Sequence, residues 1–184
     1  MKINETSIKG AYWFAPDVIE DSRGFFYRAF CRNEFKKEEI NLDEIVQINH
    51  SFNKHKGTFR GFHFQHPPFS EEKIVKCIKG EISDIIIDLR KGSDTFLKSE
   101  FVVLSEENKR SLLIPKGCAH GFITLKGDCE LVYLHTQYYN PEYEGGLSVS
   151  DPLLKIKLPM EIVEISDRDR DRKFLPTDFT GIEL

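Results

Sequence analysis

The stretch from Lys73 to Arg90 reads KIVKCIKGEISDIIIDLR, and its pattern is repeated along much of the chain. Two runs of branched apolar residues, Lys73–Ile78 and Ile82–Leu89, are separated by Lys79-Gly80. Branched side chains favour extended backbone, and glycine favours a tight turn. The stretch therefore predicts two consecutive β-strands joined by a short turn.

Similar short runs lie on both sides of this stretch, and glycine-containing turns separate many of them. They are Thr58–Gln65, Glu100–Leu104, Ser111–Ile114, Phe122–Leu125 and Glu130–His135. Many short runs of this kind are typical of an antiparallel sandwich or barrel. One helix is predicted over Asn33–Ile40 with Asn33 as its N-cap, and the charged segment Ile165–Arg172 is either a helical turn or a loop. We therefore expect an all-β fold with a few short helices.

Length and composition exclude several classes of protein. The 184 residues suit one domain, which we expect to cover residues 1–184. The 26 Lys and Arg against 30 Asp and Glu give a net charge of −4, which offers no overall attraction to nucleic acid or to an anionic membrane. No apolar run approaches the ~20 residues that span a bilayer, and the first residues, MKINE, show no signal peptide. The four cysteines form no C-x-x-C pair, so we expect free thiols in the cytoplasm.

The segment Thr58–Gln65, TFRGFHFQ, carries the first candidate for chemistry. Alternation along a strand places Phe62 and Phe64 toward a core, and it turns His63 and Gln65 toward the other side, which in a barrel is the interior cavity. Imidazole titrates near neutral pH, so His63 is a candidate base. The alternative is a buried histidine held by hydrogen bonds.

Arginine and glycine stand together twice, at Arg23-Gly24 and at Arg60-Gly61. The planar guanidinium suits phosphate oxygens, so both arginines are candidate phosphate ligands, although each could instead be a solvated surface residue. Strict alternation places Arg60 on the Phe62 side of its strand, unless a bulge at Gly61 turns it round.

Two further strands carry polar groups among apolar neighbours. Tyr133 lies within Glu130–His135 and is a candidate acid, or alternatively a packed tyrosine with a bonded hydroxyl. Asp84 lies among isoleucines, where an unpaired carboxylate is costly, so we expect a partner, and His120 is the candidate.

Metal and nucleotide-hydrolysis sites are disfavoured. The chain has no H-x-H pair, and no Gly-rich phosphate loop or dinucleotide-binding motif. We expect no functional metal.

Taken together, motifs in a fixed order resemble the dTDP-4-dehydrorhamnose 3,5-epimerase family over roughly residues 1–176. The residues that carry the resemblance are Asp21–Phe26, Val46–Ser51, Arg60–Gln65, Lys73–Val75, Gly80–Ile82, Asp88–Arg90, Ile114–Phe122, Tyr133, Tyr138–Pro141, Asp151-Pro152 and Ser166–Arg170. The resemblance implies a cupin-like jelly-roll fold and a nucleotide-diphosphate sugar as substrate. It also implies no metal or organic cofactor, and a homodimer whose subunits exchange strands and pocket residues.

The resemblance also implies roles for individual residues in epimerising a nucleotide-linked 4-keto-6-deoxyhexose at C3 and C5. His63 matches the base, Asp169 the carboxylate that orients it, Tyr133 the acid on the opposite sugar face, and Lys73 the cation beside the developing enolate oxygen. Eight more residues are expected to bind the substrate or nucleotide: Arg23 and Arg60 at the diphosphate, Phe26, Gln47, Asn49 and Tyr138 in the nucleotide-side pocket, and Arg28 and His120.

Some positions depart from the family pattern. Arg28 stands where glutamate is common, Leu134 replaces the lysine after the tyrosine, and Val149 and Leu158 stand where tryptophan is common. Glu72 adds a charge beside Lys73. Three alternatives stay open: a single-site (C3 or C5) epimerase, an epimerase or 3,4-ketoisomerase acting on a different (CDP- or GDP-linked) keto sugar, and a non-catalytic sugar-binding jelly roll.

Overall fold

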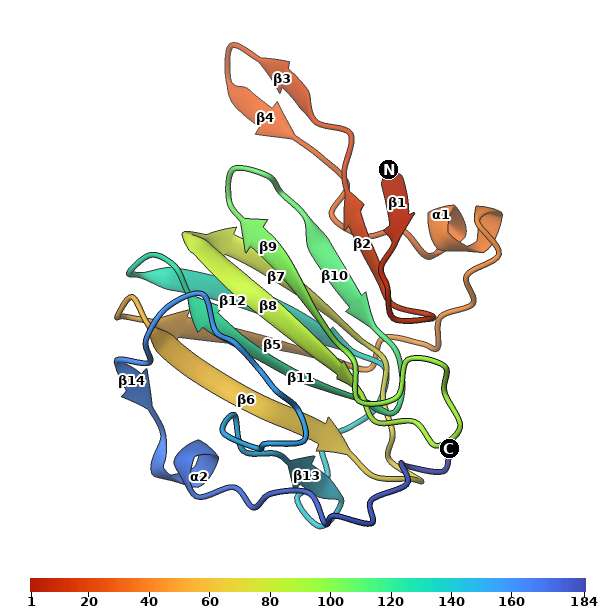
Figure 1. Ribbon diagram of the computed structural model, residues 1–184. Helices are drawn as coiled ribbons and strands as arrows, with labels where there is room; N and C mark the ends of the chain where they lie inside the picture. Colours follow the sequence, from red (N-terminus) through yellow and green to blue (C-terminus); the bar gives the residue numbers. More distant parts are fainter.

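Two antiparallel β-sheets face each other in the computed structural model, which describes residues 1–184 (Figure 1). The first sheet has the strand order β1 (Lys2–Glu5), β2 (Tyr12–Ala15), β10 (Ser111–Ile114), β7 (Lys73–Lys79), β12 (Cys129–His135) and β5 (Gln47–Asn53). The second has the order β13 (Glu144–Gly146), β6 (Thr58–Gln65), β11 (Cys118–Thr124), β8 (Glu81–Asp88) and β9 (Ser99–Ser105), and β14 (Glu164–Ile165) pairs with β6. The fold is a cupin-like jelly-roll sandwich, which confirms the predicted all-β class.

The strands expected around Gly80 are both present, but they lie in different sheets. β7 pairs with β10 and β12 in the first sheet, whereas β8 pairs with β9 and β11 in the second. Gly80 has a φ of +80°, and a Cβ there would lie 2.6 Å from the sulfur of Cys129. A glycine is therefore required where the chain crosses between the sheets.

Apolar side chains form three clusters that hold these layers together. Between the sheets, Val75 and Leu131 of the first meet Ile86 and Phe122 of the second. The outer face of the second sheet packs against the C-terminal segment through residues that include Phe62, Phe64, Ile85, Ile87, Leu147 and Ile182. The outer face of the first sheet is covered in part by the helix α1 (Arg32–Lys37) through Phe14, Phe35, Ile74 and Leu113. The predicted core face of Phe62 and Phe64 is thus confirmed.

The predicted helix over Asn33–Ile40 has the wrong ends. The helix begins at Arg32, and Cys31 is the N-cap without a capping hydrogen bond from its side chain. Asn33 lies inside the first turn, so the expected Asn33 cap is wrong. The charged C-terminal segment does form a helical turn, α2 (Asp167–Arg170), and the side chain of Ser166 caps it by accepting a hydrogen bond from the Asp169 amide.

A bulge in β6 overturns the placement of Arg60 by strict alternation. His63 lies opposite His120, and Arg60 lies opposite Phe122, so β6 carries one extra residue between the two pairs. Gly61 has a φ of +139°, and a Cβ there would lie 2.6 Å from the Cα of Gly121. The extra residue turns Arg60 to the same side as His63.

A separate hairpin, β3 (Ile19–Asp21) with β4 (Gly24–Phe26), projects from the body (Figure 1). Phe25 stacks on Tyr27, and the ammonium groups of Lys109 and Lys76 lie over these two rings. These contacts hold the hairpin at its base and leave its outer residues in solvent.

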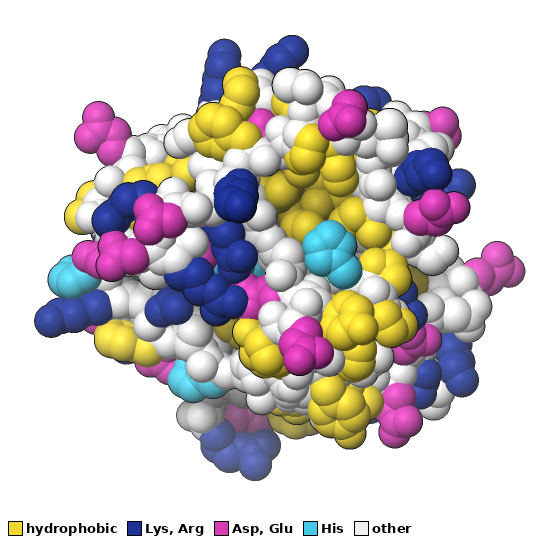
Figure 2. Space-filling model, turned by 90° about the horizontal axis from the view of Figure 1, so that it is seen from below, with side chains coloured by type: hydrophobic (Ala, Val, Ile, Leu, Met, Phe, Trp, Pro, Cys, Tyr) yellow, Lys and Arg dark blue, Asp and Glu magenta, His cyan; other side chains and the backbone are white.

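The surface carries charges of both signs. Figure 2, which looks at the molecule from below, shows basic and acidic side chains interspersed with apolar ones over that face. None of the helices is long and apolar enough to cross a bilayer.

Candidate active site

A cavity of about 340 Å³ opens between the two sheets. The first sheet lines it from β5, β7 and β12, the second lines it from β6, β11 and β13, and α2 adds Arg168. Its lining includes Asn49, Arg60, His63, Lys73, His120 and Tyr133 among the residues predicted from the sequence. The cavity therefore gathers residues that lie more than 80 positions apart.

His63 and Asp169 form a close pair at the cavity wall. His63 Nε2 lies 2.6 Å from Asp169 Oδ1, and the Gly61 amide donates to Asp169 Oδ2 at 3.2 Å. Burial alone would raise the pKa of Asp169, but the hydrogen bond and charge of His63 outweigh it and lower the pKa. The carboxylate thus fixes Nε2 as the donor and leaves Nδ1 free to accept a proton.

Tyr133 projects from β12 of the facing sheet. Its hydroxyl lies 3.0 Å from the hydroxyl of Ser51 on β5. Burial raises the pKa of Tyr133 above its ordinary value, and the contact with Ser51 only partly offsets this. The hydroxyl therefore keeps its proton at neutral pH and can donate it.

Lys73 belongs to a buried charged group next to Tyr133. Lys73 Nζ lies 3.4 Å from Glu71 Oε1, and Glu71 Oε2 lies 2.7 Å from His135 Nδ1. Burial favours the neutral form of Glu71, but the charge of Lys73 and the hydrogen bonds from His135 and Lys73 outweigh it and lower the pKa of Glu71. Lys73 thus supplies a positive charge inside the cavity.

The expected pairing of Asp84 with His120 is confirmed. His120 Nε2 lies 2.6 Å from Asp84 Oδ1, and both side chains are buried. Burial raises the pKa of Asp84 and lowers that of His120, while their contact opposes both shifts.

Arg60 reaches the cavity because of the bulge in its strand. Its Nε donates to Asn53 Oδ1 at 2.7 Å, and its guanidinium remains available to an anion. Asn49 lies on the facing sheet, where its amide nitrogen is 3.3 Å from His135 Nε2.

Gln47 and Tyr138 lie beside the cavity rather than in its lining. Gln47 Oε1 accepts a hydrogen bond from the backbone amide of Tyr139, and Gln65 Nε2 donates to the backbone carbonyl of Tyr138. The Tyr138 side chain is 62% exposed, so its ring is available to a ligand at the rim.

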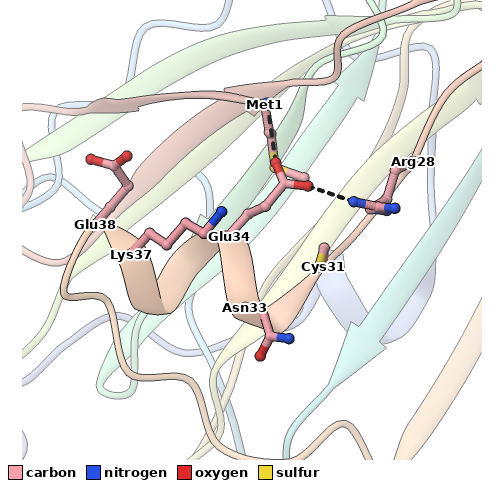
Figure 3. Close-up of a pocket in the computed structure, with 7 residues that line it drawn as sticks. All are labelled: Met1, Arg28, Cys31, Asn33, Glu34, Lys37 and Glu38. Carbon is pink, nitrogen blue, oxygen red and sulfur yellow. Dashed lines mark hydrogen bonds and ion pairs between the residues drawn. The ribbon is translucent and has the colours of Figure 1, made fainter.

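Three predicted ligand residues lie outside the cavity. Arg23 and Phe26 are on the projecting hairpin, where Arg23 pairs with Asp21 and Phe26 is 71% exposed. Arg28 lines a separate polar pocket beside α1, where it pairs with Glu34 at 3.0 Å (Figure 3). Within one chain, therefore, these residues do not join His63 and Tyr133.

Sequence reasoning missed several residues of the cavity. His135 was signalled only by its two-residue spacing from Tyr133, which places both on one face of β12, whereas Glu71 lies two residues before Lys73, the first residue of β7. Glu144 accepts hydrogen bonds from Arg168, Arg172 and Tyr139, and these contacts between distant segments left no local pattern.

No group of three or more His, Cys, Asp or Glu side chains is placed to share a metal ion.

A jelly roll with a carboxylate-paired histidine on one sheet and a partly buried tyrosine on the other has the layout of an acid–base enzyme. The family model described as dTDP-4-dehydrorhamnose 3,5-epimerase matches residues 5–176. A dTDP-4-dehydrorhamnose 3,5-epimerase of Shigella flexneri is 39% identical over 180 residues, which cover 97% of this chain and 99% of that protein. The chain belongs to the dTDP-4-dehydrorhamnose 3,5-epimerase family, whose members are isomerases.

Two solved structures of such enzymes superpose closely. That from Bacillus anthracis str. Ames, with TDP and PPi bound, has a TM-score of 0.91 and 36% identity, and the match covers 95% of this chain and 99% of that one. That from Legionella pneumophila Philadelphia 1, in complex with dTDP-4-keto-L-rhamnose, has a TM-score of 0.91 and 35% identity, covering 100% and 98%.

Proposed function

We propose that this protein converts dTDP-4-dehydro-6-deoxy-D-glucose into dTDP-4-dehydro-L-rhamnose by inverting C3 and C5 without a cofactor. The observation that carries the proposal is that His63 and Tyr133 extend from facing sheets into one cavity that also holds Lys73. Inversion needs a base on one face of the sugar and an acid on the other, and this arrangement supplies both.

The first step is removal of a proton. The C4 carbonyl acidifies the hydrogens on C3 and C5, and His63 accepts one of them at Nδ1. Asp169 stabilises the imidazolium that results. The enolate oxygen then develops beside Lys73, and a well-placed donor of this kind contributes about 3–4 kcal/mol.

The second step is protonation from the opposite face. Tyr133 gives its proton to the carbon, which inverts the centre, and the bond to Ser51 supports the phenolate that remains. Arg60 and His120 bind the substrate within the cavity, with Arg60 at the diphosphate. Gln47, Asn49 and Tyr138 form the side that receives the nucleotide.

The remaining ligand groups come from a second protomer in this proposal. Ile19, Phe25 and Phe26 expose apolar surface on the hairpin, which is typical of a docking element. In a homodimer the hairpin would carry Arg23 to the diphosphate and Phe26 to the base of the partner's substrate. Arg28 follows the hairpin and contributes at the nucleotide end.

Mixing two inactive variants tests the homodimer. Arg23→Ala and His63→Ala each lack one half of such a composite site, so exchange of subunits should restore activity in about a quarter to a half of the sites. Light scattering should report twice the chain mass. A monomeric mass with full activity would refute the shared site.

The wider expectations are a single domain over residues 1–184, no nucleic-acid or membrane partner, and a cytoplasmic location. All four cysteines are free thiols, which supports a reducing compartment.

Deuterium exchange tests the activity. The protein incubated with the dTDP-linked 4-keto sugar in D₂O should incorporate deuterium at both C3 and C5, as measured by NMR. Label at one carbon would identify a single-site epimerase, and no label with any 4-keto sugar nucleotide would refute enzymatic activity. Thermal shifts with dTDP, CDP, UDP and GDP report which base is bound, because a ligand stabilises the state that binds it.

Variants assign the two roles. His63→Ala should abolish exchange, whereas Tyr133→Phe should lose completed inversion more than initial proton removal. Tyr12→Phe, on β2 in the cluster that covers the outer face of the first sheet, is the matched control and should behave as the unaltered protein.

A further inference from the structure

The inner face of the first sheet presents a ladder of polar residues at the cavity. Lys73 on β7 lies opposite His135 on β12, which lies opposite Gln47 on β5. One step further in, Tyr133 lies opposite Asn49. His135 therefore stands between the proposed enolate-stabilising lysine and the proposed nucleotide side, and neither of the steps described above uses it.

The two carboxylate oxygens of Glu71 contact different side chains, Lys73 and His135. One of its oxygens lies 3.4 Å from Lys73 Nζ, and the other lies 2.7 Å from His135 Nδ1. The side chains of Glu71 and Lys73 are only 8% and 9% exposed, so water screens their attraction weakly. The positive charge that Lys73 can offer to a substrate thus depends on how strongly Glu71 is held elsewhere.

The contacts of His135 match its neutral form. Nδ1–H donates to Glu71, and Nε2 lies 3.3 Å from the Asn49 amide nitrogen, which donates to it. The titratable groups that face the ring are Glu71 and Lys73 from the β7 side and Tyr133 on its own strand, while β5 contributes only the amides of Gln47 and Asn49. A proton on Nε2 would need a new acceptor, and an anionic ligand in the cavity supplies one.

We propose that His135 is a proton-linked positioning residue, which gains a proton as a nucleotide diphosphate enters the cavity and thereby draws Glu71 away from Lys73. The proton comes from solvent. With His135 neutral, the group of Lys73, Glu71 and His135 carries no net charge; with His135 protonated, it carries one positive charge. The inference rests on the proposed function, because that function brings the diphosphate and the enolate to this group.

Proton uptake on binding is the first test. Titration calorimetry with dTDP in buffers of different ionisation enthalpy should show that a fraction of a proton is taken up per ligand at pH 7.5. The uptake should fall in His135→Gln, which lacks the ring that takes up the proton. It should also fall in Glu71→Gln, which lacks the carboxylate that stabilises the imidazolium. His55→Gln, a surface control on the β5–β6 loop, should match the unaltered protein.

His63→Gln removes a second histidine of the cavity and leaves the group around Lys73 intact. The uptake should persist in this variant. Binding of dTDP with no proton uptake, or with undiminished uptake in His135→Gln, would overturn the inference while leaving the proposed function in place. Failure of dTDP to bind would overturn both.

The second test compares kcat in two variants for which different effects are expected. His135→Gln should lower kcat about tenfold at neutral pH, because Glu71 then pairs with Lys73 permanently. Glu71→Gln removes the competing carboxylate, so kcat should be retained and should no longer fall as His135 loses its proton. The double variant should behave as Glu71→Gln. Equal losses in all three variants would indicate a purely structural role and refute the inference.

Discussion

Replacing Asp169 with asparagine tests the central pair of the site, because the carboxylate accepts two hydrogen bonds at once. Oδ1 receives His63 Nε2–H and Oδ2 receives the Gly61 amide. Asparagine keeps the shape but has only one acceptor oxygen. If that oxygen faces Gly61, the NH₂ group faces His63 and forces its proton onto Nδ1, the atom proposed to accept the substrate proton. If it faces His63, the Gly61 amide loses its acceptor.

The magnitude follows from these two losses. A hydrogen bond to a charged group contributes about 1.5–3 kcal/mol, and leaving a buried donor unsatisfied costs about 1–3 kcal/mol. Asparagine incurs one of these losses or the other, about 1–3 kcal/mol, which corresponds to a decrease in kcat of roughly 5- to 200-fold, because each 1.36 kcal/mol changes a rate tenfold. Substrate binding should change much less, since Asp169 acts on the substrate only through His63.

Solvent deuterium exchange and epimerisation, both followed by NMR, measure this effect. Asp167→Asn is the matched control, because Asp167 lies on the same short helix but is exposed and pairs with Arg170. The control should retain its activity. An Asp169→Asn variant within threefold of the unaltered rate, with an unchanged melting temperature, would refute the role assigned to the carboxylate.

Two further predictions concern stability. Burial opposes ionisation of Asp88, but hydrogen bonds from Arg90 and two hydroxyls lower its pKa to about 2. The ionised Asp88 stabilises the folded state by roughly 1–3 kcal/mol above the unfolded pKa of about 4, and this contribution is lost as the pH falls toward 2. Denaturant melts should therefore show that Asp88→Asn is destabilised at pH 7 but little changed near pH 2. Gly61→Ala should lower the free energy of unfolding by about 2–4 kcal/mol, because its Cβ would meet Gly121 and its φ is positive. Gly92→Ala shares only the positive φ and should cost about 1 kcal/mol by the same melts. Equal costs in the two variants would exclude a steric contribution at Gly61.

The strands could be predicted because their signal is local. Branched residues and turn glycines mark β7 and β8 within a few positions of each other. Their assignment to opposite sheets could not be predicted, because pairing depends on partners such as β10 and β9 that lie elsewhere in the chain.

The candidate site also contains some residues with a local sequence signal and others without one. His63 stood out from its own strand, but the contact with Asp169 spans 106 positions, and only the resemblance to a family suggested it. Strict alternation places Arg60 on the wrong side of its strand, because a bulge can be recognised only from the pairing register with the neighbouring strand. Glu71 was missed because one of the two neighbours that give it a role, His135, is 64 positions away in the sequence.

Two histidine–carboxylate pairs stand in this cavity, and burial separates their roles. Both have a 2.6 Å contact between Nε2 and a carboxylate oxygen. The side chain of His63 is 37% exposed, so its second nitrogen can reach a substrate and its charged form is solvated. The side chain of His120 is 6% exposed, and burial lowers its pKa, which favours the neutral ring. Of the two, only His63 combines an accessible ring with a carboxylate whose pKa is lowered, which supports the proposal that the base lies on β6.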